Sequence, residues 1–97
     1  MYVANFMSDT VSVINPITST VTATINVGEQ PRGIAYDGSN IYVANFVDNT
    51  VSVINPNTNT VTATIPVGND PWGVAFNGTN IYVSNAGDDT VSKLLPE

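Results

Sequence analysis

The sequence predicts an all-β chain made of repeated four-stranded antiparallel meanders. Its composition is the first reason, because Thr, Asn, Ser and Val are abundant and only 10% of the residues are charged. Side chains branched at Cβ favour extended backbone, while Asn, Asp, Ser and Gly close the turns between strands. The second reason is an internal repeat. The tetrapeptide that begins at Tyr2 returns at Tyr42 and, with Ser84 in place of Ala, at Tyr82, which is a period of 40 residues without insertion.

Turn chemistry divides the central copy of the repeat into four strands. They are expected over residues 33–36, 41–45, 50–54 and 60–65. Gly38 can take a positive φ and so closes the hairpin between the first two. Pro56 has no N–H to donate to a ladder and therefore ends the third. The fourth strand alternates apolar residues with Thr, as a strand with one wet face does, whereas the second and third are more continuously apolar and are expected inside a stack of sheets.

An uninterrupted repeat of such meanders is typical of β-propeller blades, which stack around an axis because a lone sheet cannot bury two apolar faces. A single array, 1–97, is predicted, with an ordinary β-sandwich as the competing interpretation. It contains a blade without its first strand (1–27), a complete blade (31–67) and a blade without its fourth strand (71–97). About two and a half blades form an incomplete ring, since closed rings have roughly four to eight. The unpaired edges predict either part of a longer propeller or a protomer that self-associates through its edge strands as a homo-oligomer.

Four motifs follow one another in the repeat: the Tyr-Val-Ala-Asn tetrapeptide, Thr-Val-Ser-Val-Ile-Asn at 10–15, Thr-Val-Thr-Ala-Thr-Ile at 20–25, and the Val-Gly, Pro and Gly after them. Together they resemble the YVTN-family β-propeller repeat over nearly the whole chain. Ala4, Ala44 and Ser84 stand where the family name has Thr, and Asn15 and Asn55 stand where members often have Asp. The resemblance implies an extracellular or envelope-associated module, known from surface-layer and secreted proteins, and it implies no catalytic motif.

Charge and composition exclude several classes of partner. The net charge is −6, because eight acidic residues are balanced only by Arg32 and Lys93. Such a surface repels phosphate backbones and anionic headgroups, so nucleic acid is not expected as a partner. No apolar run approaches the roughly 18 residues that span a bilayer, and residues 1–5 have the pattern of a strand rather than of a signal peptide. Membrane insertion is therefore not expected. The absence of Cys removes disulfides and thiolate chemistry.

Two candidate contact residues occupy one repeat position. Arg32 and Trp72 both lie between Pro and Gly, where the loop after the fourth strand enters the next first strand. This position predicts that both lie near the mouth of the central tunnel. Arg and Trp are the residue types that most often anchor binding, although one loop position can also drift without function.

A second candidate is a rim of carboxylates. Asp9, Asp48, Asp88 and Asp89 recur near the link between the second and third strands. Such a rim could serve a hard, oxygen-preferring cation. The stronger interpretation is structural, because Asp and Asn also close turns by accepting backbone N–H groups, and no loop has the dense acidic spacing of a calcium loop.

Other repeated side chains have a structural interpretation. Most of the aromatic residues are expected to pack between blades: Tyr2, Tyr42, Tyr82, Phe6, Phe46, Tyr36 and Phe76. Asn5, Asn45 and Asn85 end the second strand of each copy and are expected to hydrogen-bond backbone there.

The sequence favours a scaffold over a catalyst. The chain has no His, no Cys and one Lys, and its carboxylates are neighbours in loops rather than facing pairs. No enzyme activity and no cofactor are expected from these residues. The leading hypothesis is an extracellular or envelope scaffold that binds a protein or other ligand at its loop rim and tunnel mouth. Its rivals are a protomer that assembles through edge strands and a fragment of a propeller enzyme whose active site lies in other blades.

Overall fold

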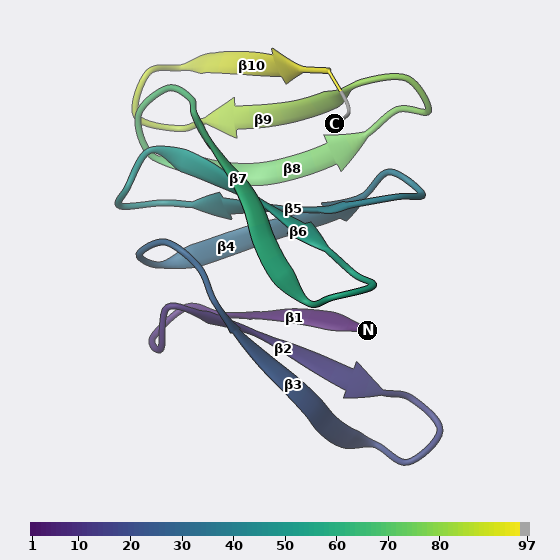
Figure 1. The fold of residues 1–97 in the computed structure, drawn as a ribbon. Helices are drawn as coiled ribbons and strands as arrows, with labels where there is room; N and C mark the ends of the chain where they lie inside the picture. The colour runs from purple at the N-terminus through teal and green to yellow at the C-terminus, as the bar shows by residue number, and fades with distance from the viewer. Residues whose placement is uncertain (96–97) are drawn as a thin grey trace.

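The computed structural model describes residues 1–95, which form ten strands in three antiparallel sheets (Figure 1). The first sheet contains β1 (Tyr2–Asn5), β2 (Thr10–Asn15) and β3 (Thr20–Asn26). The second contains β4 (Pro31–Tyr36), β5 (Ile41–Asn45), β6 (Thr50–Asn55) and β7 (Thr60–Pro66). The third contains β8 (Pro71–Phe76), β9 (Ile81–Asn85) and β10 (Thr90–Leu94). The predicted all-β fold of incomplete and complete propeller blades is confirmed, and the last two residues of the predicted third blade lie outside the described residues.

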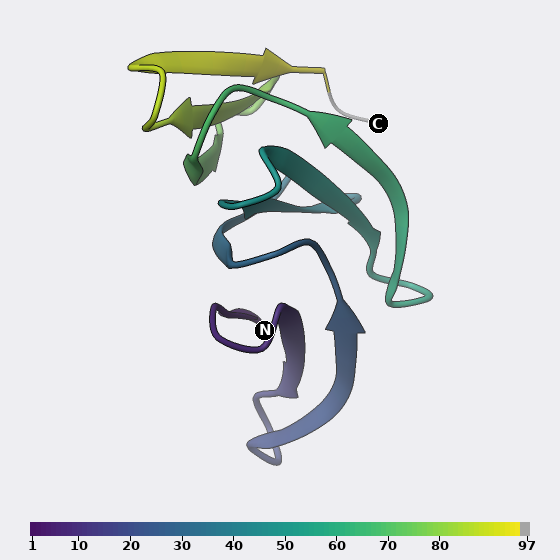
Figure 2. The ribbon, with the colours of Figure 1, turned by 90° about the vertical axis from the view of Figure 1, so that its left-hand side faces the viewer.

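The sheets stack as successive blades of an open array. In Figure 2 they lie one above another, with β3 and β7 on one side and β1, β4 and β8 on the other. Strand β4 contacts both β1 and β8, whereas β3 and β7 barely touch. In the second and third blades the first strand, β4 or β8, is therefore the inner one. Within residues 1–95 there is no helix with the length and apolar character needed to cross a membrane.

Each junction between blades is filled by its own apolar cluster. Between the first and second sheets lie Val11, Ile25, Ile41, Val43 and Ile54. Between the second and third lie Tyr42, Val51, Val53, Ile81 and Val83. The complete central blade is covered on both faces, so every residue of β5 is buried, while β7 keeps its Thr side chains exposed. The predicted positions of these strands in the stack are confirmed. Burial of each large aliphatic side chain contributes roughly 1.5–3 kcal/mol, which makes the junctions the main source of stability.

Strand boundaries differ from the prediction at the inner strand. The sequence indicated a start at Gly33, but β4 begins at Pro31, which is buried. A bulge follows: Pro31 pairs with Asn45 and Ile34 with Val43, so Arg32 and Gly33 share one partner position. The same irregularity recurs in β8 between Pro71 and Val74. A bulge redirects the side chains that it contains, and here these are Arg32 and Trp72.

Candidate functional site

Five loops gather at one end of the blades, on the left in Figure 1, and we call their surface the loop face. They are residues 6–9, 27–30, 46–49, 67–70 and 86–89. Backbone hydrogen bonds join each loop to the next. Val27 N–H donates to Asp9 O (3.1 Å), Phe46 N–H to Gln30 O (3.0 Å), Val67 N–H to Asn49 O (3.0 Å) and Ala86 N–H to Asp70 O (2.9 Å). The loop face is therefore one continuous hydrogen-bonded surface across all three blades rather than five independent loops.

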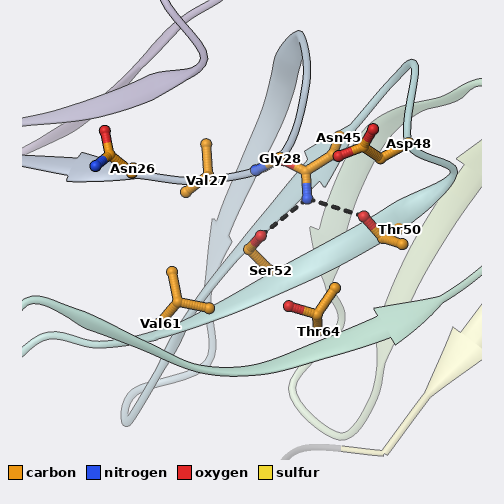
Figure 3. Close-up of a pocket in the computed structure, with 9 residues that line it drawn as sticks. All are labelled: Asn26, Val27, Gly28, Asn45, Asp48, Thr50, Ser52, Val61 and Thr64. Atoms are coloured by element: carbon orange, nitrogen blue, oxygen red, sulfur yellow. Dashed lines mark hydrogen bonds between the residues drawn. The ribbon is translucent and has the colours of Figure 1, made fainter.

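A buried asparagine holds the second blade, and likewise the third, to the loop before it. Asn45 Nδ2 donates to Thr50 Oγ1 (3.1 Å) and Ser52 Oγ (2.9 Å), and its Oδ1 accepts the N–H of Gly28 (3.2 Å). These bonds use both amide protons and the carbonyl of a fully buried side chain, two of them visible in Figure 3. The arrangement recurs in the third blade, where Asn85 bonds Thr90, Ser92 and the N–H of Gly68. The predicted structural role is confirmed, with side-chain hydroxyls as additional partners.

The glycines in these loops are required by that close approach. A Cβ on Gly28 would lie 2.6 Å from Asn45 Cγ, and one on Gly68 would lie 2.7 Å from Asn85 Cγ. Neither space can hold a methyl group without moving the asparagine. The glycine of the repeated Val-Gly pair is therefore needed because the asparagine 17 residues later packs against it and accepts its N–H.

The carboxylates of the predicted rim occupy two adjacent repeat positions. Asp48 and Asp88 reach backward along the chain, accepting the N–H of Glu29 (3.0 Å) and Asn69 (2.9 Å). Asp9 belongs to the other position and accepts the N–H of Gln30 (3.0 Å). Asn49 replaces it in the second blade and accepts the N–H of Asp70 (2.9 Å).

Backbone conformation explains why this second position is Asp or Asn. Asp9, Asn49 and Asp89 have φ of 58°, 58° and 56°. Asp and Asn tolerate this left-handed region better than other residues with a Cβ. Within residues 1–95, no group of three or more Asp, Glu, His or Cys side chains lies close enough together to hold a metal ion. Where the carboxylates have partners, these are backbone and side-chain N–H groups of the loops, as the structural interpretation expects.

An arginine surrounded by aromatic rings lies at the centre of the loop face. The Arg32 Cζ is 4.2 Å from the ring centroid of Phe6, 4.5 Å from that of Phe46 and 4.0 Å from that of Trp72. The three rings come from three different blades. Phe46 and Trp72 also meet edge to face, with centroids 5.6 Å apart. We call these four residues the arginine cluster.

The Arg32 guanidinium contacts three aromatic rings but has no hydrogen-bond acceptor among residues 1–95. Arg32 Nε is buried and makes no hydrogen bond, and no ion pair joins Arg32 to the residues that the structure describes. Attraction between a cation and each ring contributes from about 0.5 to 2 kcal/mol, more as the site is desolvated. The rings therefore stabilise the charge of the only arginine in the chain.

Arg32 and Trp72 were predicted to lie near the mouth of the central tunnel, and the structure places them in contact at the start of the inner strands β4 and β8. The role of Phe6 and Phe46 was missed, because their position in the repeat matches blade packing equally well. Tyr36 was also assigned wrongly: it is 56% exposed, and its hydroxyl donates to Gly38 O (2.9 Å). Tyr42, by contrast, is fully buried between blades, as predicted.

The loop face exposes apolar side chains beside the cluster. Trp72 is 50% exposed, Val47 43% and Met7 87%. Met7 and Val47 occupy one repeat position, and Gly87 takes it in the third blade. The exposed apolar surface is thus concentrated over the first two blades and Trp72.

A pocket of about 440 Å³ lies behind the loop face, where the end of β3 passes β6 and β7 (Figure 3). It is lined by the Asn45 network together with Val61 and Thr64. The amide of Asn45 already has a partner for each donor and for its carbonyl, and Asp48 accepts the N–H of Glu29. The pocket wall is consequently part of the junction between blades.

The repeated junctions and the inner bulged strands define the class of protein: an open array of β-propeller blades. The family model for YNCE-like β-propeller proteins matches residues 1–76, and the chain belongs to this family. A search of curated proteins finds no match.

Solved structures support the same fold. Hydrazine synthase from Kuenenia stuttgartiensis is similar with a TM-score of 0.77 and 24% identity, covering 95% of this chain and 31% of that one. A functionally unknown protein from Desulfotomaculum acetoxidans has a TM-score of 0.66 and 20% identity, covering 92% of this chain and 35% of that one. The chain spans about a third of the length of either structure. The resemblance to the YVTN type of propeller repeat is confirmed at the level of fold and family.

Proposed function

We propose that this chain is a non-enzymatic β-propeller scaffold, extracellular or envelope-associated, that binds a partner through its loop face. The observation that carries the proposal is the half-exposed Trp72 packed on Arg32 at the centre of that face. Large amphipathic residues in a desolvated centre are the usual anchors of protein interfaces. The location outside the cytoplasm rests on the resemblance to the YVTN type of repeat.

Rigidity of the loop face supports this function. Each loop is hydrogen-bonded to its neighbour through the backbone, and the loops 27–30 and 67–70 are also capped by side chains from the loops on either side. A surface that is ordered before binding loses less conformational entropy when it binds. The chemistry of the face also favours binding over catalysis, since Asp9, Asp48, Asp88 and Asn49 are already engaged as acceptors of loop N–H groups.

A selection with random peptides displayed on phage tests the proposal. Peptides enriched on the immobilised wild-type chain should lose binding to Trp72→Ser by about tenfold or more. They should keep binding to Tyr36→Ser, which removes an exposed aromatic residue at the opposite end. Peptides that bind both variants equally would contradict the loop face as the contact surface.

A second candidate function is assembly through the terminal blades, favoured by the edge strands β1 and β10, each of which pairs with one strand only among residues 1–95. Apolar side chains are exposed beside both edges, Val3 at 38% and Val91 at 66%. A strand with free ladder groups recruits another strand. Light scattering over a wide concentration range should then show a discrete oligomer, and a Val3→Lys, Val91→Lys double variant should be monomeric. A wild-type chain that stays monomeric throughout would exclude assembly.

A further inference from the structure

From the distribution of charge we infer that the partner of the loop face is basic, a lysine- or arginine-rich peptide segment with Trp72 at the centre of its contact. The inference rests on the proposed function and names the chemistry of the ligand. A cationic protein segment is the expected partner because each of the five loops of the face carries at least one carboxylate.

Acidic residues are concentrated on this face. Of the eight in the chain, six lie in its loops: Asp9, Glu29, Asp48, Asp70, Asp88 and Asp89. Of the other two, Asp37 lies in the hairpin at the opposite end, and Glu97 is outside the described residues. Arg32 is the only basic residue of the face, and Lys93 lies in β10. The field of such a surface attracts cations and raises the association rate of a basic partner.

Three of the carboxylates are not used by the fold. Asp9, Asp48 and Asp88 accept loop N–H groups. Glu29, Asp70 and Asp89 have no hydrogen-bonding side-chain partner among residues 1–95, and their charges are not paired. These three are free to pair with cations of a partner.

Apolar side chains at the centre of the loop face add to the attraction for a basic segment. Trp72, Val47 and Met7 expose apolar surface on the same face, close to the arginine cluster. The stems of Lys and Arg are themselves apolar and pack on such side chains while their charged heads reach carboxylates. A neutral apolar partner would gain nothing from the surrounding charge, and an acidic one would be repelled by it.

Arg32 does not reverse this preference. Its guanidinium is placed among three rings, within 4.0 to 4.5 Å of each centroid, and its Nε is buried. An acidic ligand would have to approach the exposed part of this one cation across six carboxylates. Binding of an anion can nevertheless be detected at this site, because Arg32 is the single arginine of the chain and its Nε–Hε signal can be followed by NMR.

The experiment is a titration that uses Trp72, the single tryptophan, as the fluorescent reporter. Hexalysine and hexaglutamate peptides are added to the full chain at low and at physiological ionic strength. Hexalysine should change the fluorescence of Trp72 saturably, with an affinity that falls about tenfold as salt is raised. Hexaglutamate should have no effect.

A charge-neutral variant locates the site. Glu29→Gln, Asp70→Asn and Asp89→Asn together remove the three unused charges, and the repeat already tolerates uncharged polar residues at these positions, namely Asn69, Gln30 and Asn49. Hexalysine should bind this variant about tenfold or more weakly. The matched control, Asp37→Asn, removes one charge at the opposite end and should bind as the wild type does.

The outcomes separate the inference from the proposed function. Equal binding of hexalysine to the wild type and the triple variant, or no binding at all, overturns the basic partner. Binding of hexaglutamate with a shift of the Arg32 Nε–Hε signal in NMR spectra also overturns it and identifies an anion site. Peptides selected through Trp72 that carry no positive charge would leave the loop face as a contact surface and refute only its preference for cations.

Discussion

The two ends of the blades are built in different ways. At the loop face, hydrogen bonds join residues 17 to 21 positions apart and so connect neighbouring blades. At the opposite end each hairpin is closed by its own residues, as where Asp37 Oδ1 accepts the N–H of Ser39 (2.8 Å) and Asn40 (2.7 Å). Order at the loop face therefore depends on the stacking of blades. The hairpins at the opposite end are ordered mainly by their own residues, with a hydrogen bond between blades from the Tyr2 hydroxyl to Asn59 Oδ1 (3.0 Å). A surface used for binding is expected at the end that the whole array holds rigid.

The largest expected effect is at the buried asparagine of the central blade. Asn45→Ala leaves the N–H of Gly28 and the hydroxyl of Ser52 without partners, which should cost about 3 kcal/mol of unfolding free energy in urea. Asn5 makes the equivalent two bonds to Thr10 and Ser12, but accepts no glycine N–H among residues 1–95. Asn5→Ala should therefore cost about 1 kcal/mol less. Equal losses would show that the bond between blades contributes nothing.

The inner strands provide the next largest effect. A Cβ on Gly33 would lie 2.6 Å from the backbone oxygen of Trp72, so Gly33→Ala has to separate β4 from β8 and should cost about 2 kcal/mol. Gly38 has φ of 95° and open space around it, so Gly38→Ala introduces only local strain, about 1 kcal/mol. Urea unfolding measures both changes. A larger loss at Gly38 would contradict the difference between the two ends.

The arginine cluster should have a smaller effect on stability. Arg32→Met keeps an apolar side chain among the rings but removes the cation, and should cost about 1 kcal/mol. The emission of Trp72 should shift at the same time, since its ring loses the guanidinium 4.0 Å away. Lys93→Met removes the other cationic side chain and should change neither quantity. An unchanged spectrum of the Arg32→Met variant would show that the cation does not contact the indole in solution.

The smallest effect concerns acid at the hairpin end. Burial raises the pKa of Asp37, but hydrogen bonds from the N–H groups of Asn40 and Ser39 and from the Tyr42 hydroxyl outweigh it and place that pKa below its ordinary value of 3.8. A carboxyl with a lowered pKa stabilises the fold above its unfolded-state value, and this stability is lost as the pH falls through the folded-state value. Asp37→Asn should therefore flatten the dependence of stability on pH only below about pH 4. A difference of slope near neutral pH would refute this assignment.

Some features of the loop face were accessible from sequence and others were not. The common position of Arg32 and Trp72, and the acceptor role of the loop carboxylates, follow from the period of 40 and from turn chemistry. The contribution of Phe6 and Phe46 did not follow, because a ring beside a repeated strand fits a blade junction as well as a tunnel mouth. The bulge in β4 turns the Arg32 side chain toward Phe6 and Phe46, and this contact places both rings in the arginine cluster.

The sequence by itself determined the all-β meander, the order of its strands and the alternation of its outer ones, since these depend on short-range propensity and on a period that survives in every copy. Tertiary structure alone decided which groups meet between blades. Gly28 and Asn45 are 17 residues apart, and the three rings around Arg32 come from three sheets, so no local pattern records their contact. Contacts of this kind exist only once the blades stack, because stacking is what brings distant loops to one end of the molecule.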